Sequence, residues 1–242
     1  MDMEKRGISD NEETAERAID VVAILTEGFD ALADAGSVSI DHDKGPVFLT
    51  TYGWWAGITR SAQAVVTLHK AGLPHESAPI VRTVLQHALV LQWFVDTGDN
   101  AVAAVDEYAD NNTRKLLQTL ADANWAAPGG GFTMTAPPKP AAPNPLVSKL
   151  KNFEELCIAY QKRDVYVLFR VLSSYAHPTA IGARVYLDEQ SGKLAREATS
   201  DTHSMVIQTA LCLIQASHIV SHLIQGDPLR NAINRATARL GL

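Results

Sequence analysis

A largely apolar stretch of the chain, residues 78–95 (APIVRTVLQHALVLQWFV), contains polar side chains that include Arg82, Gln86 and His87. A helix that is apolar on nearly every face is usually buried in a protein core. A buried guanidinium must be paired or hydrogen-bonded, because leaving it bare in an apolar medium costs several kcal/mol. The stretch therefore predicts a buried polar site, and binding or catalysis is best sought there.

A second group of polar residues lies in the sequence SSYAHP, near the end of a later helix. Its hydroxyl-bearing side chains are Ser173, Ser174 and Tyr175. His177 precedes Pro178, so its backbone is biased to an extended form and the helix is expected to end there. A histidine at a helix carboxyl terminus is stabilised as the cation. Arg82, Gln86 and His177 together would suit an anion such as phosphate or carboxylate. The alternative is that His177 only caps its helix.

A third polar pattern follows one face of a long apolar helix near the end of the chain. It consists of Ser204, Gln208, Gln215, His218 and His222. Two histidines four residues apart share a helix face, which zinc can use, but the sequence offers no third ligand. We therefore expect no metal and interpret the stripe as a buried hydrogen-bond network.

Two short motifs carry a resemblance to a known superfamily. Arg82 and His87 form the motif Arg-x4-His, and residues 173–178 read Ser-Ser-Tyr-Ala-His-Pro. With these motifs, residues 50–180 resemble the HEPN superfamily of helical bundles. The chain looks most similar to a bacterial branch with the motifs Arg-Ser/Thr-x-x-Glu and Ser-x-Tyr-x-His-Pro, and Gln86 stands in place of that Glu.

In HEPN ribonucleases the Arg-x4-His type of motif supplies the active site, usually across a dimer. The resemblance therefore implies a metal-independent ribonuclease of the toxin or phage-defence kind, with Arg82 and His87 catalytic and His177 assisting. The imidazole would take the proton of a ribose 2′-hydroxyl, and the guanidinium would stabilise charge on the phosphate. No cofactor would be needed. Independently of the resemblance, we expect Gln86, Ser174 and Tyr175 to contact the bound RNA or nucleotide. Partners would be a second copy or an antitoxin-like protein.

Helical geometry limits how Arg82 and His87 can cooperate. At about 100° per residue they lie about 140° apart around the helix, so they can share a site only at a helix end or across two copies. In the alternative interpretation, Arg82 clamps neighbouring helices through a buried ion pair and His87 fills the core. Two other functions stay open. One is a non-catalytic module that binds a nucleotide or another anion, and the other is a structural protein that pairs through its apolar helices.

The overall composition is that of an ordinary globular protein. The 242 residues carry a formal net charge of −6, which argues against a non-specific grip on nucleic acid but allows a small basic pocket. Cys157 and Cys212 fit no metal or redox spacing, so we expect a reducing, cytoplasmic setting. No run approaches the roughly 18 apolar residues that span a bilayer, so no membrane contact is expected.

The elements that would position these residues are almost all helices. Apolar periodicity and breaker residues predict helices at 11–35, 47–71, 76–95, 101–125, 145–160, 165–176, 202–225 and 229–240. We expect a frayed end at 1–11, a flexible Pro/Gly-rich insertion at 126–145 and a small β-hairpin at 184–196. The predicted fold is thus a single all-α domain spanning 1–242, a HEPN-like helical bundle with a long loop and a minor hairpin.

Overall fold

Helices dominate the computed structural model, which describes residues 8–125, 135–188, 191–198 and 203–242. The first four are α1 (Glu12–Asp34), α2 (Gly45–Lys70), α3 (Ala78–Thr97) and α4 (Asp99–Asp122). Four shorter ones follow: α5 (Val147–Lys151), α6 (Phe153–Ala159), α7 (Arg163–Ala176) and α8 (Ala180–Arg184). After the antiparallel hairpin of β1 (Leu187–Asp188) and β2 (Lys193–Leu194) come α9 (His203–Ser221) and α10 (Arg230–Leu240). The all-α fold class and the small hairpin are confirmed.

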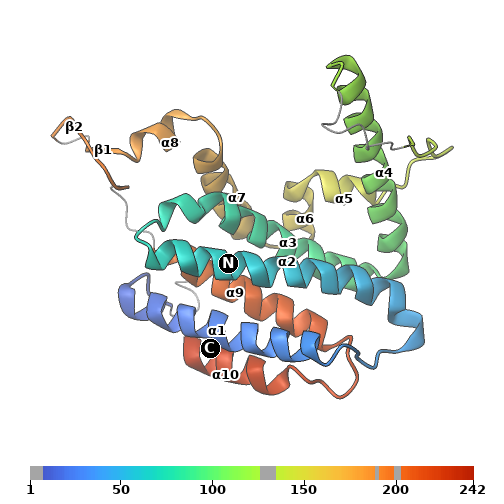
Figure 1. Cartoon of the computed structure of the whole chain (residues 1–242), viewed down its shortest axis with the longest axis horizontal. Helices are drawn as coiled ribbons and strands as arrows, with labels where there is room; N and C mark the ends of the chain where they lie inside the picture. The colour runs from blue at the N-terminus through green and yellow to red at the C-terminus, as the bar shows by residue number, and fades with distance from the viewer. Residues whose placement is uncertain (1–7, 126–134, 189–190, 199–202) are drawn as a thin grey trace.

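The helix α9 forms the centre of the bundle. It packs against α1, α2, α3 and α10, so helices from both ends of the sequence surround it (Figure 1). A buried hydrogen bond also joins α9 to α2: the indole Nε1 of Trp55 on α2 donates to Ser217 Oγ on α9 at 3.1 Å. Helix α9 therefore packs against α1, α2 and α3, which precede it by more than a hundred residues.

The same helix corrects the expectation about apolar runs. Within the described ranges, α9 is the one helix long and apolar enough to cross a bilayer by length and composition. In the structure 83% of its apolar window is buried inside the bundle. The apolar composition of α9 is therefore explained by its place in the protein core.

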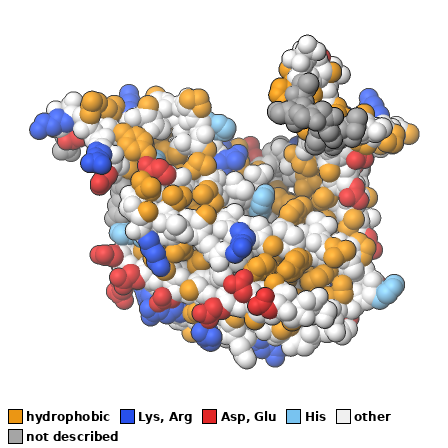
Figure 2. Space-filling view, viewed as in Figure 1, with side chains coloured by type: hydrophobic (Ala, Val, Ile, Leu, Met, Phe, Trp, Pro, Cys, Tyr) orange, Lys and Arg blue, Asp and Glu red, His pale blue; other side chains and the backbone are white. Residues whose placement is uncertain are grey.

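Two parts of the molecule project from the bundle, one on each side (Figures 1 and 2). One is α4, in which only Ala101 and Ala104 are buried among its described residues. The other is α8 with the hairpin, which is tied back where the Tyr186 hydroxyl donates a hydrogen bond to Glu76, just before α3. Helices α6 and α7 lie between the two projections.

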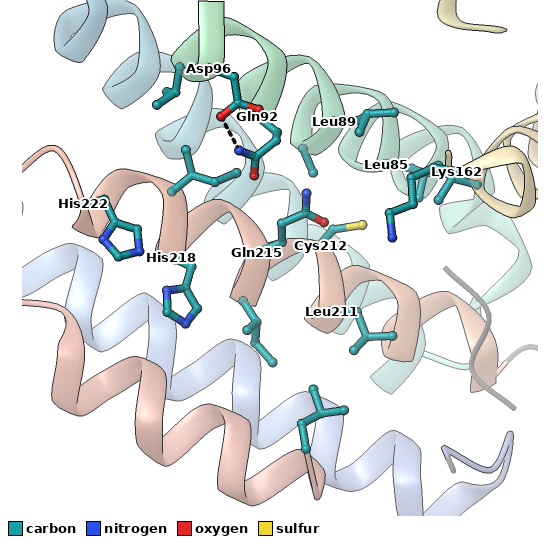
Figure 3. A pocket seen from close by; sticks show the side chains of 16 residues that line it. Leu85, Leu89, Gln92, Asp96, Lys162, Leu211, Cys212, Gln215, His218 and His222 are labelled. Carbon is teal, nitrogen blue, oxygen red and sulfur yellow. Dashed lines mark hydrogen bonds between the residues drawn. The ribbon is translucent and has the colours of Figure 1, made fainter. Parts of the chain in front are cut away.

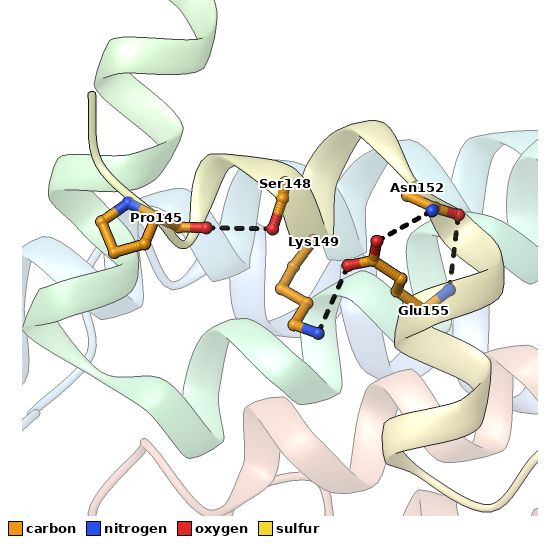
Figure 4. Close-up of polar contacts among 5 residues, drawn as sticks. All are labelled: Pro145, Ser148, Lys149, Asn152 and Glu155. Carbon is orange, nitrogen blue, oxygen red and sulfur yellow. Dashed lines mark hydrogen bonds and ion pairs between the residues drawn. The ribbon is translucent and has the colours of Figure 1, made fainter.

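Several predicted boundaries change for local reasons. The helix expected at 145–160 is two helices, because Asn152 is extended (φ −119°, ψ 91°) and its side chain caps α6 (Figure 4). The helix expected to reach 225 ends at Ser221, and the hairpin starts later than expected because Ala180–Arg184 forms α8. Residues 135–145 contain no helix or strand, as predicted, whereas residues 126–134 lie outside the described part.

The amino-terminal prediction is wrong where it can be compared. Residues 1–7 lie outside the described ranges, but Ile8 is buried in the hydrophobic core with 6% of its surface exposed. Asn11 is also ordered as the cap of α1, where its Oδ1 accepts a hydrogen bond of 2.9 Å from the Thr14 backbone. An apolar side chain and a capping amide thus fix residues that looked like a frayed end.

Candidate anion site

The half-buried side chain of Arg82 joins α3 to α7. Its Nε donates a hydrogen bond of 2.8 Å to Ser173 Oγ, and its Cζ lies 4.3 Å from the centroid of the Phe169 ring. Ser173 in turn donates to the Phe169 carbonyl oxygen at 2.7 Å. Because Phe169 and Ser173 are four residues apart on one helix, they present a ring and a hydroxyl on the same face. Together they fix the plane of the guanidinium.

Arg82 does clamp two helices, but the expected ion pair is not what does so. No carboxylate lies within salt-bridge distance of Arg82 in the described part of the chain. The contacts to Ser173 and Phe169 use Nε and one face of the group. The two Nη groups therefore keep donors for another partner, and planar pairs of such donors suit phosphate and carboxylate oxygens.

The ring beneath Arg82 is itself held in place. Phe153, at the start of α6, packs on Phe169 with ring centroids 4.5 Å apart, and both rings are buried. The Asn152 cap fixes where α6 begins: the Glu155 backbone N–H donates to Asn152 Oδ1 at 3.4 Å, and Asn152 Nδ2 donates to Glu155 Oε1 at 3.0 Å (Figure 4). The short helix α6 thus holds in place the Phe169 ring that contacts the Arg82 guanidinium.

The other predicted residues of α3 lie on two sides of Arg82. Gln86 is half-buried one turn further along, on nearly the same face, and no hydrogen bond of its amide is found to any described residue. His87 is exposed, so the interpretation in which it fills the core is wrong. Partial burial among its neighbours nevertheless lowers the pKa of His87 below the ordinary histidine value. Its imidazole is therefore neutral at pH 7 and able to accept a proton.

The residues of the SSYAHP segment have separate surroundings. His177 is exposed at the end of α7 in the expected extended form (φ −115°, ψ 156°), one turn beyond Ser173. Ser174 Oγ donates to the Val171 carbonyl of its own helix at 2.6 Å, and the Tyr175 ring packs edge-on against His75 with centroids 4.5 Å apart. Of the predicted site residues, Arg82 contacts α7 and Gln86 lies one turn from it on α3, whereas His177 follows the end of α7, and Ser174 and Tyr175 are engaged elsewhere.

Sequence reasoning missed the two residues that orient the guanidinium. In the sequence, Ser173 is one of three adjacent hydroxyl-bearing residues, and Phe169 is one of many aromatic residues. The available signal was their spacing of four residues, which places a ring and a hydroxyl together on α7. That signal becomes specific only when α7 is known to face α3.

The polar stripe of α9 is not a buried network. His218 and His222 are exposed, and their rings stack with centroids 5.6 Å apart. They border a cavity of about 650 Å³ between α3 and α9, into which Gln215 also points (Figure 3). Gln208 is buried, and its Oε1 has no hydrogen-bond partner among the described residues. The prediction of a buried network is wrong because α9 turns this face partly toward an open cavity.

Comparison with known proteins adds one finding. Residues 49–194, more than half of the chain, match the model of a family of unknown function, DUF5677. The chain belongs to the DUF5677 family. The DUF5677 region runs from α2 to the hairpin and includes both sides of the Arg82–Ser173 contact, whereas α1, α9 and α10 lie outside it. No curated protein and no solved structure matches the chain.

Proposed function

We propose that this chain is a cytoplasmic protein that binds a phosphate-bearing ligand, a nucleotide or single-stranded RNA, through Arg82. One observation carries the proposal: a half-buried guanidinium is oriented by Ser173 and Phe169 while no described carboxylate neutralises it. Holding an arginine in one orientation before the ligand arrives lowers the entropy cost of binding. Gln86, one turn from Arg82 on nearly the same face of α3, supplies a further polar contact to the ligand.

The charge of the whole chain makes this recognition local. With a formal net charge of −6, the protein has no general attraction for polyanions, so affinity must come from the fixed guanidinium. Hydrogen bonds to a charged group contribute roughly 1.5–3 kcal/mol. Removing Arg82 should therefore lower phosphate affinity by about tenfold or more.

The test is a titration of the purified chain with ATP and with a short single-stranded RNA, followed by calorimetry and fluorescence anisotropy. We expect binding that Arg82→Ala weakens by about tenfold or more and that Arg82→Lys weakens less, because a lysine keeps the charge but cannot form two parallel hydrogen bonds. Arg170→Ala is the matched control, since Arg170 is an exposed arginine on α7. Equal affinity in Arg82→Ala and the wild type, with circular dichroism showing that both are folded, would reject the proposal.

A second candidate, a metal-independent ribonuclease, is favoured by one observation at His87. The imidazole is exposed and its pKa is lowered, so it is available as a base at neutral pH. Because His87 lies on a different side of α3 from Arg82, the catalytic pair would have to come from two copies of the chain in a homodimer. Such an enzyme would suit a toxin or phage-defence role with an antitoxin-like partner.

A mixing experiment tests the ribonuclease directly. Incubation of the chain with single-stranded RNA in EDTA should give cleavage that both Arg82→Ala and His87→Ala abolish. Mixing the two inactive variants should restore part of the activity, because each mixed dimer contains one intact pair. Cleavage that persists in both variants indicates a contaminating nuclease and rejects this candidate, and so does the absence of cleavage by the wild type.

A further inference from the structure

The cavity between α3 and α9 is distinct from the Arg82 site. It has a volume of about 650 Å³, within the range of roughly 300–1,000 Å³ that is typical of sites for small organic molecules. On α3 its wall is formed by the face that carries Leu85, Leu89 and Gln92, and Arg82 does not line it. The first turn of α7 and the carboxyl-terminal Leu242 close its edges.

The walls of this cavity are chiefly hydrocarbon. Leu85 and Leu89 face Leu211 across the space (Figure 3), and Ile214 and Ile219 line the same cavity. The Cys212 side chain adds to the same surface: burial raises the pKa of its thiol to about 12, so the thiol is protonated and uncharged at neutral pH. A ligand that fills the space must therefore present an apolar body.

The polar groups of the cavity point to the charge of the ligand. Gln215 projects into the middle of the space, and its amide forms no hydrogen bond with any described residue. The Lys162 ammonium projects in from the edge and has no carboxylate partner in the described chain. An amide and an ammonium without partners are donors that a carboxylate group can satisfy.

The one acidic side chain that lines the cavity, within the described ranges, is already engaged. Asp96 Oδ1 accepts a hydrogen bond of 2.8 Å from Gln92, and Asp96 Oδ2 accepts one of 2.7 Å from the Tyr160 hydroxyl. The imidazoles of His218 and His222 border the cavity and add further donors. Apart from Asp96, the polar groups that line the cavity thus offer hydrogen-bond donors to a ligand.

We propose that this cavity binds a small amphipathic carboxylate, whose hydrocarbon chain lies between α3 and α9 and whose carboxylate accepts hydrogen bonds from Lys162 and Gln215. The proposal concerns a site separate from the anion site at Arg82 and does not depend on the function proposed there. The apolar walls supply affinity through burial of the chain, and the polar donors select the anion over a neutral or cationic head group.

The experiment uses the full chain and the polarity-sensitive dye anilinonaphthalene sulfonate, which has an apolar body and an anionic group. We expect the dye to bind, and decanoate below its micelle concentration to displace it. Decanol and decyltrimethylammonium have the same alkyl chain without the negative charge. These two compounds should displace the dye only at roughly fivefold higher concentrations or more, because each lacks one charge-assisted hydrogen bond that decanoate makes.

Two pairs of variants locate the binding site. Gln215→Trp fills the cavity from a half-buried position and should abolish displacement by decanoate, whereas Gln118→Trp on the projecting part of α4 should not. Lys162→Glu should weaken decanoate but leave decanol unchanged, whereas Lys151→Glu, at another exposed lysine, should alter neither. Circular dichroism and thermal unfolding establish that each variant is folded.

Three results would overturn the proposal. The first is that the folded wild type binds neither the dye nor decanoate. The second is that decanoate, decanol and decyltrimethylammonium displace the dye equally well. The third is that the Gln215→Trp and Lys162→Glu variants both bind decanoate like the wild type. Arg82→Ala separates the two sites, because it should leave decanoate binding unchanged whether or not nucleotide binding is lost.

Discussion

At the scale of single residues, the hydroxyl of Ser173 restricts the orientation of the Arg82 guanidinium. Ser173→Ala removes the 2.8 Å hydrogen bond to Nε, which contributes about 1 kcal/mol. The guanidinium then rests on Phe169 alone and samples more orientations. We expect nucleotide affinity to fall about fivefold, measured by calorimetry.

The neighbouring serine gives the control. Ser174 Oγ donates to a carbonyl of its own helix, so Ser174→Ala should leave affinity unchanged. Equal losses in the two variants would show that the hydroxyl of Ser173 has no special role in orienting Arg82.

His75 predicts how stability depends on pH. Burial lowers the pKa of His75, and its buried Nδ1 has no hydrogen-bond partner among the described residues. The unfolded chain therefore binds a proton at His75 more readily than the folded protein does. The contribution of the neutral His75 ring to the free energy of unfolding is complete above about pH 6.5 and is lost as the pH falls below that value. Thermal unfolding temperatures between pH 8 and pH 5.5 should decline accordingly.

His75→Phe should reduce that decline, because the new ring keeps the contact with Tyr175 but does not titrate. The decline does not vanish, since partial burial lowers the pKa of His87 as well. His42→Gln changes an exposed histidine and should retain the full decline. If His75→Phe also retains it, the assignment to His75 is wrong.

At the scale of elements, the start of α6 controls the platform under Arg82. Asn152→Ala removes the cap of α6, and losing such a cap costs about 1 kcal/mol. Because Phe153 follows directly and packs on Phe169, the loss should also weaken nucleotide binding. Urea unfolding measures the first effect and calorimetry the second.

Ser148→Ala is the matched change on α5, where the hydroxyl donates to the Pro145 carbonyl (Figure 4). It should affect neither quantity by a comparable amount, because Ser148 is exposed and lies outside the contact with Phe169. A loss of stability in Asn152→Ala without any loss of affinity would show that α6 does not brace the site.

The elements also show what the sequence can and cannot predict. Apolar periodicity placed the long helices to within a few residues, because it reports the buried face of each helix directly. It could not choose Ser173 over Ser174, since that choice depends on how α7 is rotated against α3. The prediction of a buried hydrogen-bond network along α9 was wrong for the same reason. Polar spacing shows that His218 and His222 share a face, but not that this face borders an open cavity.

At the scale of the whole molecule, stability should be graded from the centre outward. Most residues of α9 are buried, whereas α4 beyond Ala104 buries no described residue. Hydrogen exchange should therefore be slowest in α9, where amides open only with global unfolding, and fast in the distal part of α4. Mass spectrometry of peptides from the two helices measures the difference. Comparable protection in both would mean that α4 is covered in solution, for instance by a second copy.

The position of α9 in the sequence also bears on how the chain folds as it is synthesised. Helix α1 is synthesised before α9 and α10, yet it packs against both of them. Contacts between such distant segments form slowly, because the intervening chain must first be brought together. On the ribosome, the faces of α1, α2 and α3 that pack on α9 therefore stay uncovered until residue 221 has left the exit tunnel. Truncated chains that end before α9 should accordingly be captured by chaperones, and the full-length chain released from them.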